Sequence, residues 1–109
     1  MSSGYIETGL SQEALRIHRA LASLQEELEA IDYYHQRQDV TDEAELKAVL
    51  VHNRDDEMEH AVMLLEWLRR AVPELDGQLR KILFQDGAIT TLAASPAPTG
   101  SGLGLGNLK

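Results

Sequence analysis

The fold is decided by residues 53–67, which read NRDDEMEHAVMLLEW. Extended in both directions at steps of four and three, this stretch gives a single series: Leu46, Leu50, Asn53, Glu57, His60, Leu64, Trp67 and Ala71. Residues three and four apart lie above one another on a helix, so the series is one helical face, apolar at both ends and polar in the middle. A carboxylate and an imidazole are costly to bury unless a bound group compensates them. The pattern therefore predicts a long helix with a candidate cation site on its inner face.

A second apolar stripe precedes this face. Its members also alternate at steps of four and three: Leu10, Ala14, Ile17, Leu21, Leu24, Leu28 and Ile31. Heptad spacing suits packing against another helix, and it predicts a first helix from about residue 12 to about residue 37 with Ser11 as N-cap. Residues 38–42 read as a tight turn, so we expect an antiparallel hairpin.

The later elements have signals of their own. Thr41 or Asp42 is the expected cap of the second helix, because residues 42–45 fit a capping box. This helix should end near residue 71, since Pro73 cannot sit inside it. Pro73 can instead open a short third helix that Gly87 ends, with one further turn over residues 88–92. The apolar face of that third helix is Leu75, Leu79, Ile82 and Leu83.

These elements predict an all-α fold, a two-helix antiparallel hairpin followed by a short C-terminal helix. Such a hairpin cannot bury two apolar stripes by itself, whereas a two-fold dimer of hairpins supplies the four helices of a bundle. We therefore expect an obligate homodimer or a larger assembly. Residues 1–10 are expected to form a flexible lead-in, residues 11–92 the helical domain, and residues 93–109 a flexible linker that ends in a docking peptide.

Composition narrows the classes of function. The formal net charge is -8, from 18 acidic and 10 basic residues, which argues against a nucleic-acid partner or an anionic membrane surface. The chain has no cysteine, so any metal must be held by oxygen and imidazole nitrogen. The N-terminus lacks the regions of a signal peptide, and no apolar run is long enough to span a bilayer. We expect a protein that stays in the cytoplasm.

The candidate metal ligands lie on both helices. A di-iron site in a helical bundle takes one Glu from each of two helices and a Glu-x-x-His from each of the other two. The second helix carries Glu57-x-x-His60, and the first carries Glu27 at the edge of its apolar stripe. Two chains related by a dyad would therefore complete the ligand set. The similar spacing of Asp32 and His35 lies near the end of the first helix, and we take it as incidental.

Other roles for these residues stay open. Glu27 could be a solvated acid, Glu57 could pair with Arg54, and His60 could be a core histidine with one hydrogen bond. Asn53 could fix helix register. Leu64 and Trp67 are expected to be core residues, Glu26 and Glu29 a solvated face or a weaker outer cation site, and Tyr34 either core or a hydrogen-bonding neighbour of the site.

The chain resembles the encapsulated ferritins. The resemblance rests on EELEAIDYY at residues 26–34, HNRDDEMEHA at residues 52–61 and LEWLRR at residues 65–70, and it covers about residues 11–92. Tyr33 departs from it, because a tryptophan would be expected there. The final LGLGNL, residues 103–108, is similar to the peptides that target cargo to encapsulin shells, although three leucines near a chain end can also be incidental.

The resemblance implies a half-ferritin subunit whose dimer rebuilds a four-helix bundle, with dimers joined in a ring of ten chains. It implies ferroxidase activity, in which Fe(II) is oxidised by dioxygen at a di-iron centre formed by Glu27, Glu57 and His60 of two chains. Tyr34 would be a neighbour of that centre. Glu26 and Glu29 would form an outer site for incoming metal.

The resemblance also implies storage of the iron inside an encapsulin nanocompartment, with Leu103, Leu105 and Leu108 docking on the shell. Two other functions fit the residues alone. One is a helical scaffold that docks to a partner by its tail. The other is a protein that binds metal without turnover.

Overall fold

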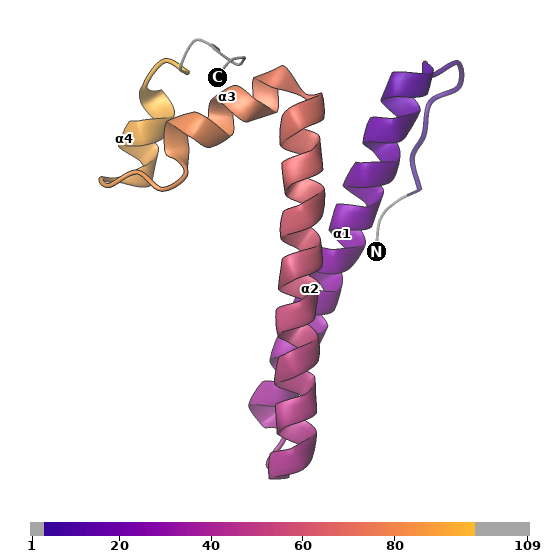
Figure 1. Cartoon of the computed structure of the whole chain (residues 1–109), viewed down its shortest axis with the longest axis vertical. Coiled ribbons are helices and arrows are strands. Elements are labelled where there is room, and N and C mark those ends of the chain that lie inside the picture. The colour runs from indigo at the N-terminus through magenta and orange to yellow at the C-terminus, as the bar shows by residue number, and fades with distance from the viewer. Residues whose placement is uncertain (1–3, 98–109) are drawn as a thin grey trace. The chain divides into compact units, whose positions relative to one another are not determined.

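The computed structural model describes residues 4–97, which contain four α-helices and no strand. The helices are α1 (Gln12–Val40), α2 (Ala44–Ala71), α3 (Pro73–Ile82) and α4 (Ile89–Ala94) (Figure 1). The all-α prediction, with two long helices followed by a short one, is confirmed. None of the helices in this described part is long and apolar enough to cross a membrane. The chain divides after Leu68 into two compact units, which are described separately.

The ends of α1 follow from local hydrogen bonds. Ser11 is its N-cap, as predicted, and the Ser11 side chain accepts a hydrogen bond from the backbone N–H of Ala14 at 3.0 Å. The helix ends at Val40, about three residues later than expected. Beyond it the Thr41 hydroxyl donates to the carbonyl of Arg37 at 2.6 Å, which satisfies one of the carbonyls that a helix end leaves unpaired.

The cap predicted for α2 was wrong. The helix begins at Ala44, and the Glu43 carboxylate accepts hydrogen bonds from the N–H groups of Glu45 at 3.1 Å and Leu46 at 2.8 Å. The reason is the longer α1. Because Thr41 closes α1, the turn shifts along the chain and Glu43 becomes the residue that meets the first free N–H groups.

In the first unit α1 and α2 lie side by side and run antiparallel (Figure 1). Polar contacts join them at two levels. The His60 imidazole lies 3.7 Å from a Glu27 oxygen, and the Arg54 guanidinium lies 3.2 Å from the His35 ring. The apolar side chains buried among residues 4–97 are Ala20, Ala61 and Leu68. Two of these are alanines, so the buried seam is thin.

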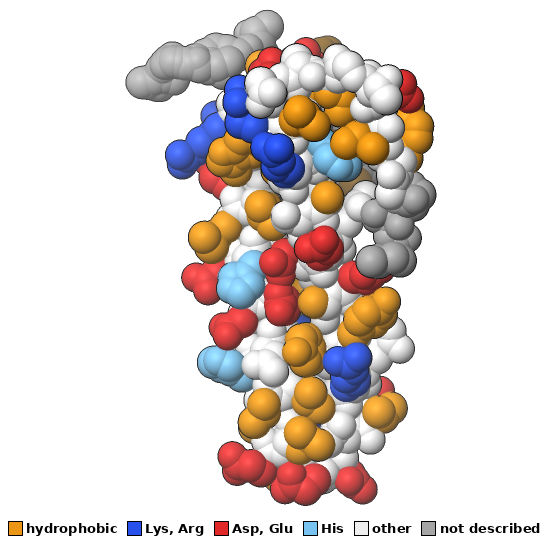
Figure 2. Space-filling model, turned by 90° about the vertical axis from the view of Figure 1, so that its right-hand side faces the viewer, with side chains coloured by type: hydrophobic (Ala, Val, Ile, Leu, Met, Phe, Trp, Pro, Cys, Tyr) orange, Lys and Arg blue, Asp and Glu red, His pale blue; other side chains and the backbone are white. Residues whose placement is uncertain are grey.

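Much of the predicted apolar stripe is open to solvent in the single chain. The exposed apolar side chains of the two long helices include Leu21, Leu28, Leu46, Met58, Val62, Met63 and Trp67. Figure 2 shows such side chains beside acidic and histidine side chains on one face. Trp67, which we expected in the core, is 42% exposed. Each large apolar side chain contributes roughly 1.5–3 kcal/mol when fully buried, so a lone hairpin leaves much of its stabilising surface unused.

The second unit contains α3 and α4, and Pro73 opens the third helix as predicted. The predicted end of α3 at Gly87 was wrong, because the helix ends at Ile82 with Leu83 as its C-cap. Pro73 opens α3, and Lys81 near its end donates a hydrogen bond to the carbonyl of Ala93 at 2.9 Å, which holds α4. Helix α4 continues to Ala94, two residues beyond the expected end at residue 92. The predicted docking leucines, Leu103, Leu105 and Leu108, lie outside the described residues.

Asp76 is the buried charged side chain of this unit. Its carboxylate accepts hydrogen bonds from Arg69 and from Arg80, whose Nε lies 3.0 Å from each carboxylate oxygen. Burial alone would raise the pKa of Asp76, but the hydrogen bonds and charges of Arg69 and Arg80 outweigh it, and the pKa lies below the ordinary value of 3.8. The paired carboxylate therefore ties α3 to the end of α2.

We predict that Asp76→Asn loosens this unit by about 2 kcal/mol, because hydrogen bonds to a charged group contribute about 1.5–3 kcal/mol. Backbone amides of α3 should then exchange hydrogen roughly 30-fold faster at pH 7. A lowered pKa stabilises above the unfolded value and is lost as pH falls through the folded value. The gap between wild type and variant should therefore close below pH 3.8. Equal exchange rates at pH 7 would contradict this role of Asp76.

Candidate metal centre

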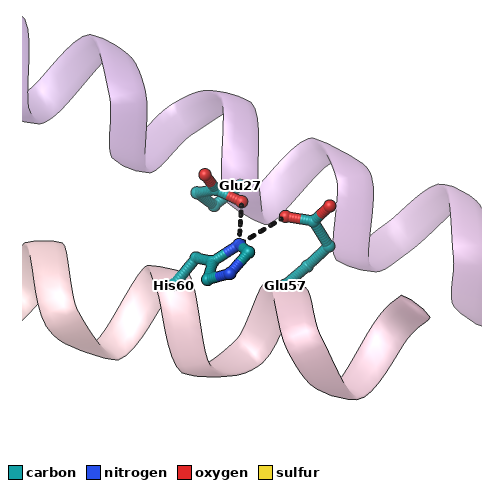
Figure 3. Close-up of side chains that lie close together, drawn as sticks. All are labelled: Glu27, Glu57 and His60. Atoms are coloured by element: carbon teal, nitrogen blue, oxygen red, sulfur yellow. Dashed lines mark hydrogen bonds and ion pairs between the residues drawn. The ribbon is translucent and has the colours of Figure 1, made fainter. Parts of the chain in front are cut away.

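Two carboxylates and one imidazole meet between α1 and α2 (Figure 3). Helix α2 supplies Glu57 and His60, which lie side by side because they are three residues apart, and α1 supplies Glu27. Nδ1 of His60 lies 3.4 Å from an oxygen of Glu57 and 3.7 Å from an oxygen of Glu27. One donor atom from each residue lies within 4.8 Å of the others. We refer to these three residues as the carboxylate–histidine cluster.

The cluster is shielded on its acidic side and open on its imidazole side. The side chains of Glu27 and Glu57 are each 25% exposed, while the His60 side chain is 51% exposed. The two acids therefore sit against the helix seam, and the imidazole faces outward. An incoming cation or a second protein surface could reach all three donors from that open side.

The donor set fits a divalent or trivalent metal. Metal–ligand distances to carboxylate oxygen and imidazole nitrogen are about 2.0–2.2 Å, so donors on one ion lie roughly 3 Å apart. The separations of 3.4 and 3.7 Å, and a largest separation within 4.8 Å, are somewhat wider than this, so small side-chain movements would bring the three donors onto a cation.

The two carboxyl groups shift each other's pKa in opposite directions. Their mutual hydrogen bond raises the pKa of Glu27, and burial and the charge of Glu57 act in the same direction, while His60 opposes the rise. The same hydrogen bond lowers the pKa of Glu57, with burial opposing and His60 adding to the effect. As pH falls, Glu27 should therefore take up a proton before Glu57 does.

Carboxyl-resolved NMR titration of the metal-free protein should show this order. We expect Glu27 to titrate above 4.5 and Glu57 below 4.5. A metal competes with the proton that Glu27 takes up in acid, so metal affinity should fall as pH falls through the raised pKa of Glu27, by up to about tenfold per pH unit. Titration of both groups at the same pH, or in the opposite order, would contradict these opposite pKa shifts.

A pocket of about 340 Å³ adjoins the cluster. It is lined by Glu27, His60, Met63, Leu64 and Trp67. Leu64 and Trp67 were expected to be plain core residues, and Met63 was not singled out, although it follows His60 by one helical step of three. The pocket places an open apolar surface directly beside the candidate ligands, so whatever covers it would also close the metal centre.

The other predicted site residues lie outside the cluster. Glu26 is exposed, and Glu29 and Tyr34 are half-buried. The Tyr34 ring lies under the guanidinium of Arg37, 5.5 Å from ring centre to guanidinium carbon. The group of potential metal ligands found among residues 4–97 does not include Glu26 or Glu29, so their role as an outer metal site stays a prediction.

The alternative roles can be compared with the same geometry. Arg54 contacts Asp55 at 3.1 Å and His35 at 3.2 Å, and it does not pair with Glu57. The second acid–histidine spacing does not form a pair either, because Asp32 accepts a hydrogen bond from Gln36 at 2.9 Å and His35 turns to Arg54. The carboxylate–histidine cluster is the group of metal-ligand type that the described residues bring together.

Several proteins are similar in sequence to most of this chain. It is 46% identical to an encapsulated ferritin-like protein of Rhodospirillum rubrum, over 92% of this chain and 82% of the relative. It is 49% identical to a ferritin-like protein of Thermotoga maritima, over 83% of this chain and 82% of that protein. An encapsulin nanocompartment cargo protein of Myxococcus xanthus is 33% identical over 69% of this chain and 58% of its own length.

The fold has a solved counterpart. The crystal structure of a protein from Nitrosomonas europaea is 52% identical, superposes with a TM-score of 0.76, and is matched over 98% of its chain and 80% of this one. The profile of the EncFtn-like family matches residues 5–86, which include both long helices and the carboxylate–histidine cluster. This chain therefore belongs to the EncFtn-like family.

Proposed function

We propose that this protein is a ferroxidase, which oxidises Fe(II) to Fe(III) with dioxygen at a di-iron centre shared by two chains. The observation that carries the proposal is the carboxylate–histidine cluster, in which two carboxylate oxygens and one imidazole nitrogen converge within 4.8 Å between α1 and α2. Carboxylates are hard ligands that suit iron in both oxidation states. Family membership and the names of the relatives support a ferritin-like role.

A second copy of the chain is the proposed source of the missing ligands. One chain offers three donors, and a two-fold dimer offers six: four carboxylates and two imidazoles. The exposed apolar side chains beside the cluster support this arrangement, since Met63 is 64% exposed and Trp67 is 42% exposed. Covering that surface would bury the pocket beside the cluster and complete the ligand set in one step.

Each residue has a defined task in this proposal. Bound iron supplies the one-electron redox chemistry, and the protein supplies geometry and charge. Glu57 keeps its negative charge to a lower pH, because its pKa is lowered, while the raised pKa of Glu27 makes its part in cation binding more sensitive to acid. Nδ1 of His60 faces the two acids, and the His60 side chain lies on the side of the cluster that is open to solvent. Tyr34 is proposed as a neighbour of the centre, and Glu26 and Glu29 as an outer site for incoming metal.

The name of one relative suggests where the oxidised iron would be delivered. This relative is named as encapsulin nanocompartment cargo. We propose that this chain also works inside an encapsulin shell in the cytoplasm, with Leu103, Leu105 and Leu108 docking on the shell and the Fe(III) product mineralising in its interior. Ten chains in a ring of dimers is the proposed assembly.

An aerobic Fe(II) oxidation time course tests the activity. Fe(II) is added to the full chain in amounts below and above two per dimer, and the Fe(III) absorbance is followed against buffer alone. A rapid phase that saturates at two irons per dimer supports the ferroxidase. Iron binding without accelerated oxidation would favour a metal-holding protein, and no iron-dependent change at all would favour the helical scaffold.

A further inference from the structure

Arg54 joins the two long helices close to the carboxylate–histidine cluster. Its Nη1 lies 3.2 Å from Nδ1 of His35 on α1, and its Nε and Nη2 lie 3.2 and 3.1 Å from Oδ1 of Asp55. The Arg54 side chain is 22% exposed, so the guanidinium lies mostly within the helix seam. A guanidinium can only donate hydrogen bonds, so Nδ1 of His35 is the acceptor in this contact.

The position of Arg54 relative to the cluster is set by helix geometry. It precedes Glu57 by three residues, so the two side chains share a face of α2 and their Cβ atoms lie about 5–6 Å apart. The Glu57 side chain projects outward from the axis of α2. A rotation of α2 about this axis would therefore swing the Glu57 carboxylate away from Glu27. The contact to His35 opposes such a rotation one turn from the ligand.

The buried apolar side chain nearest in sequence to Glu57 is small. It is Ala61, while larger neighbours such as Leu64 on α2 and Ile31 on α1 are half-buried. An alanine interlocks weakly, because it presents a single methyl group to the facing helix. Directional polar contacts therefore add to the packing that sets the rotational register near Glu57.

We propose that Arg54 is a positioning residue of the metal centre, whose hydrogen bond to His35 fixes the rotation of α2 that turns Glu57 toward Glu27. This rests on the proposed function only in treating the cluster as a metal site, and it does not depend on iron oxidation. Arg54 itself binds no metal. Asp55 holds the guanidinium from its own helix, and His35 holds it from the facing helix.

Charge alone predicts the opposite effect for this residue. A guanidinium beside a cation site repels the cation, so a bystander Arg54 would weaken metal binding, and its removal would tighten it. A positioning Arg54 strengthens metal binding, and its removal weakens it. The sign of the change in metal affinity therefore separates the two roles.

The test is a Co(II) titration of the full chain followed by visible absorption. Arg54→Met keeps the length of the stem and removes the hydrogen bond and the charge. His35→Ala removes the acceptor without changing the charge of Arg54. We expect both variants to bind Co(II) about tenfold more weakly, the range found for residues that orient metal ligands. His35→Asn, whose side-chain oxygen can replace Nδ1 as acceptor, should bind within about threefold of wild type. The matched control is Arg19→Met, which removes an exposed positive charge from α1.

An unchanged or tighter affinity in Arg54→Met and His35→Ala would overturn the proposal. Equal losses in His35→Ala and His35→Asn would also overturn it, because the acceptor would then be irrelevant. Circular dichroism of each metal-free variant checks that the helices form, and the comparison of His35→Ala with His35→Asn still tests the contact if Arg54→Met does not fold. A chain that binds Co(II) in this pattern but oxidises no Fe(II) would contradict the ferroxidase and leave this inference standing.

Discussion

Glu57→Gln is expected to lower the initial rate of aerobic Fe(II) oxidation by at least about 100-fold. Changes to residues that merely orient metal ligands already cost about 10–100-fold, and Glu57 is proposed to bind the metal itself. Glutamine keeps the size of the side chain and removes the negative charge that its lowered pKa secures. In a symmetric dimer each substitution removes two carboxylates from one shared centre, so the defect should be close to complete.

The matched control for this experiment is Asp39→Asn. Asp39 is an exposed acid near the end of α1, outside the carboxylate–histidine cluster, and its substitution changes the net charge by the same amount. Its oxidation rate should equal that of wild type. A Glu57→Gln rate within about threefold of wild type, with helicity intact, would remove Glu57 from the metal centre.

Leu28→Glu should separate the chains and abolish oxidation together. Leu28 follows Glu27, which is a proposed ligand, and it is 53% exposed in the single chain, so the substitution should destabilise the hairpin itself little. In the proposed dimer the same position is covered, and two buried carboxylates would cost about 4 kcal/mol together, or roughly 1000-fold in the dissociation constant. Sedimentation should show a smaller species, and the oxidation rate should fall in parallel.

Val40→Glu is the control for this second prediction. Val40 is an apolar residue at the end of α1 and is 82% exposed. The Val40→Glu substitution should leave both the sedimented mass and the oxidation rate unchanged. Full oxidation by a Leu28→Glu chain that sediments as a monomer would show that one chain is sufficient, and the shared centre would be wrong.

Metal binding and assembly are expected to be coupled. Fe(II) should then increase the mass of the wild-type assembly but not the mass of the Glu57→Ala assembly.

The elements and the three clustered donors could be predicted because helical spacing is a local property. Steps of three and four placed Glu57 beside His60, and the apolar stripe of the first helix placed Glu27 at its edge. Proline at position 73 likewise marked the start of the short helix that follows the hairpin. Each of these signals depends on residues within one or two helical turns, so it can be read from the sequence alone.

Features that depend on how two helices meet could not be predicted. The cap of α2 moved to Glu43 because α1 runs on to Val40. The contact between Arg54 and His35 joins residues 19 positions apart, and no spacing rule points to it. Trp67 lies on the expected apolar face, but whether that face is buried depends on a surface that a single chain does not supply.

A crystal structure of the iron-soaked protein, with anomalous scattering measured at the iron absorption edge, tests whether two chains share a di-iron centre. The proposed function predicts two iron peaks about 3.5–4 Å apart on a two-fold axis, each within about 2.0–2.3 Å of donors from Glu27, Glu57 or His60 of both chains. Iron bound by these residues from one chain only, or no iron peak beside them, would contradict it.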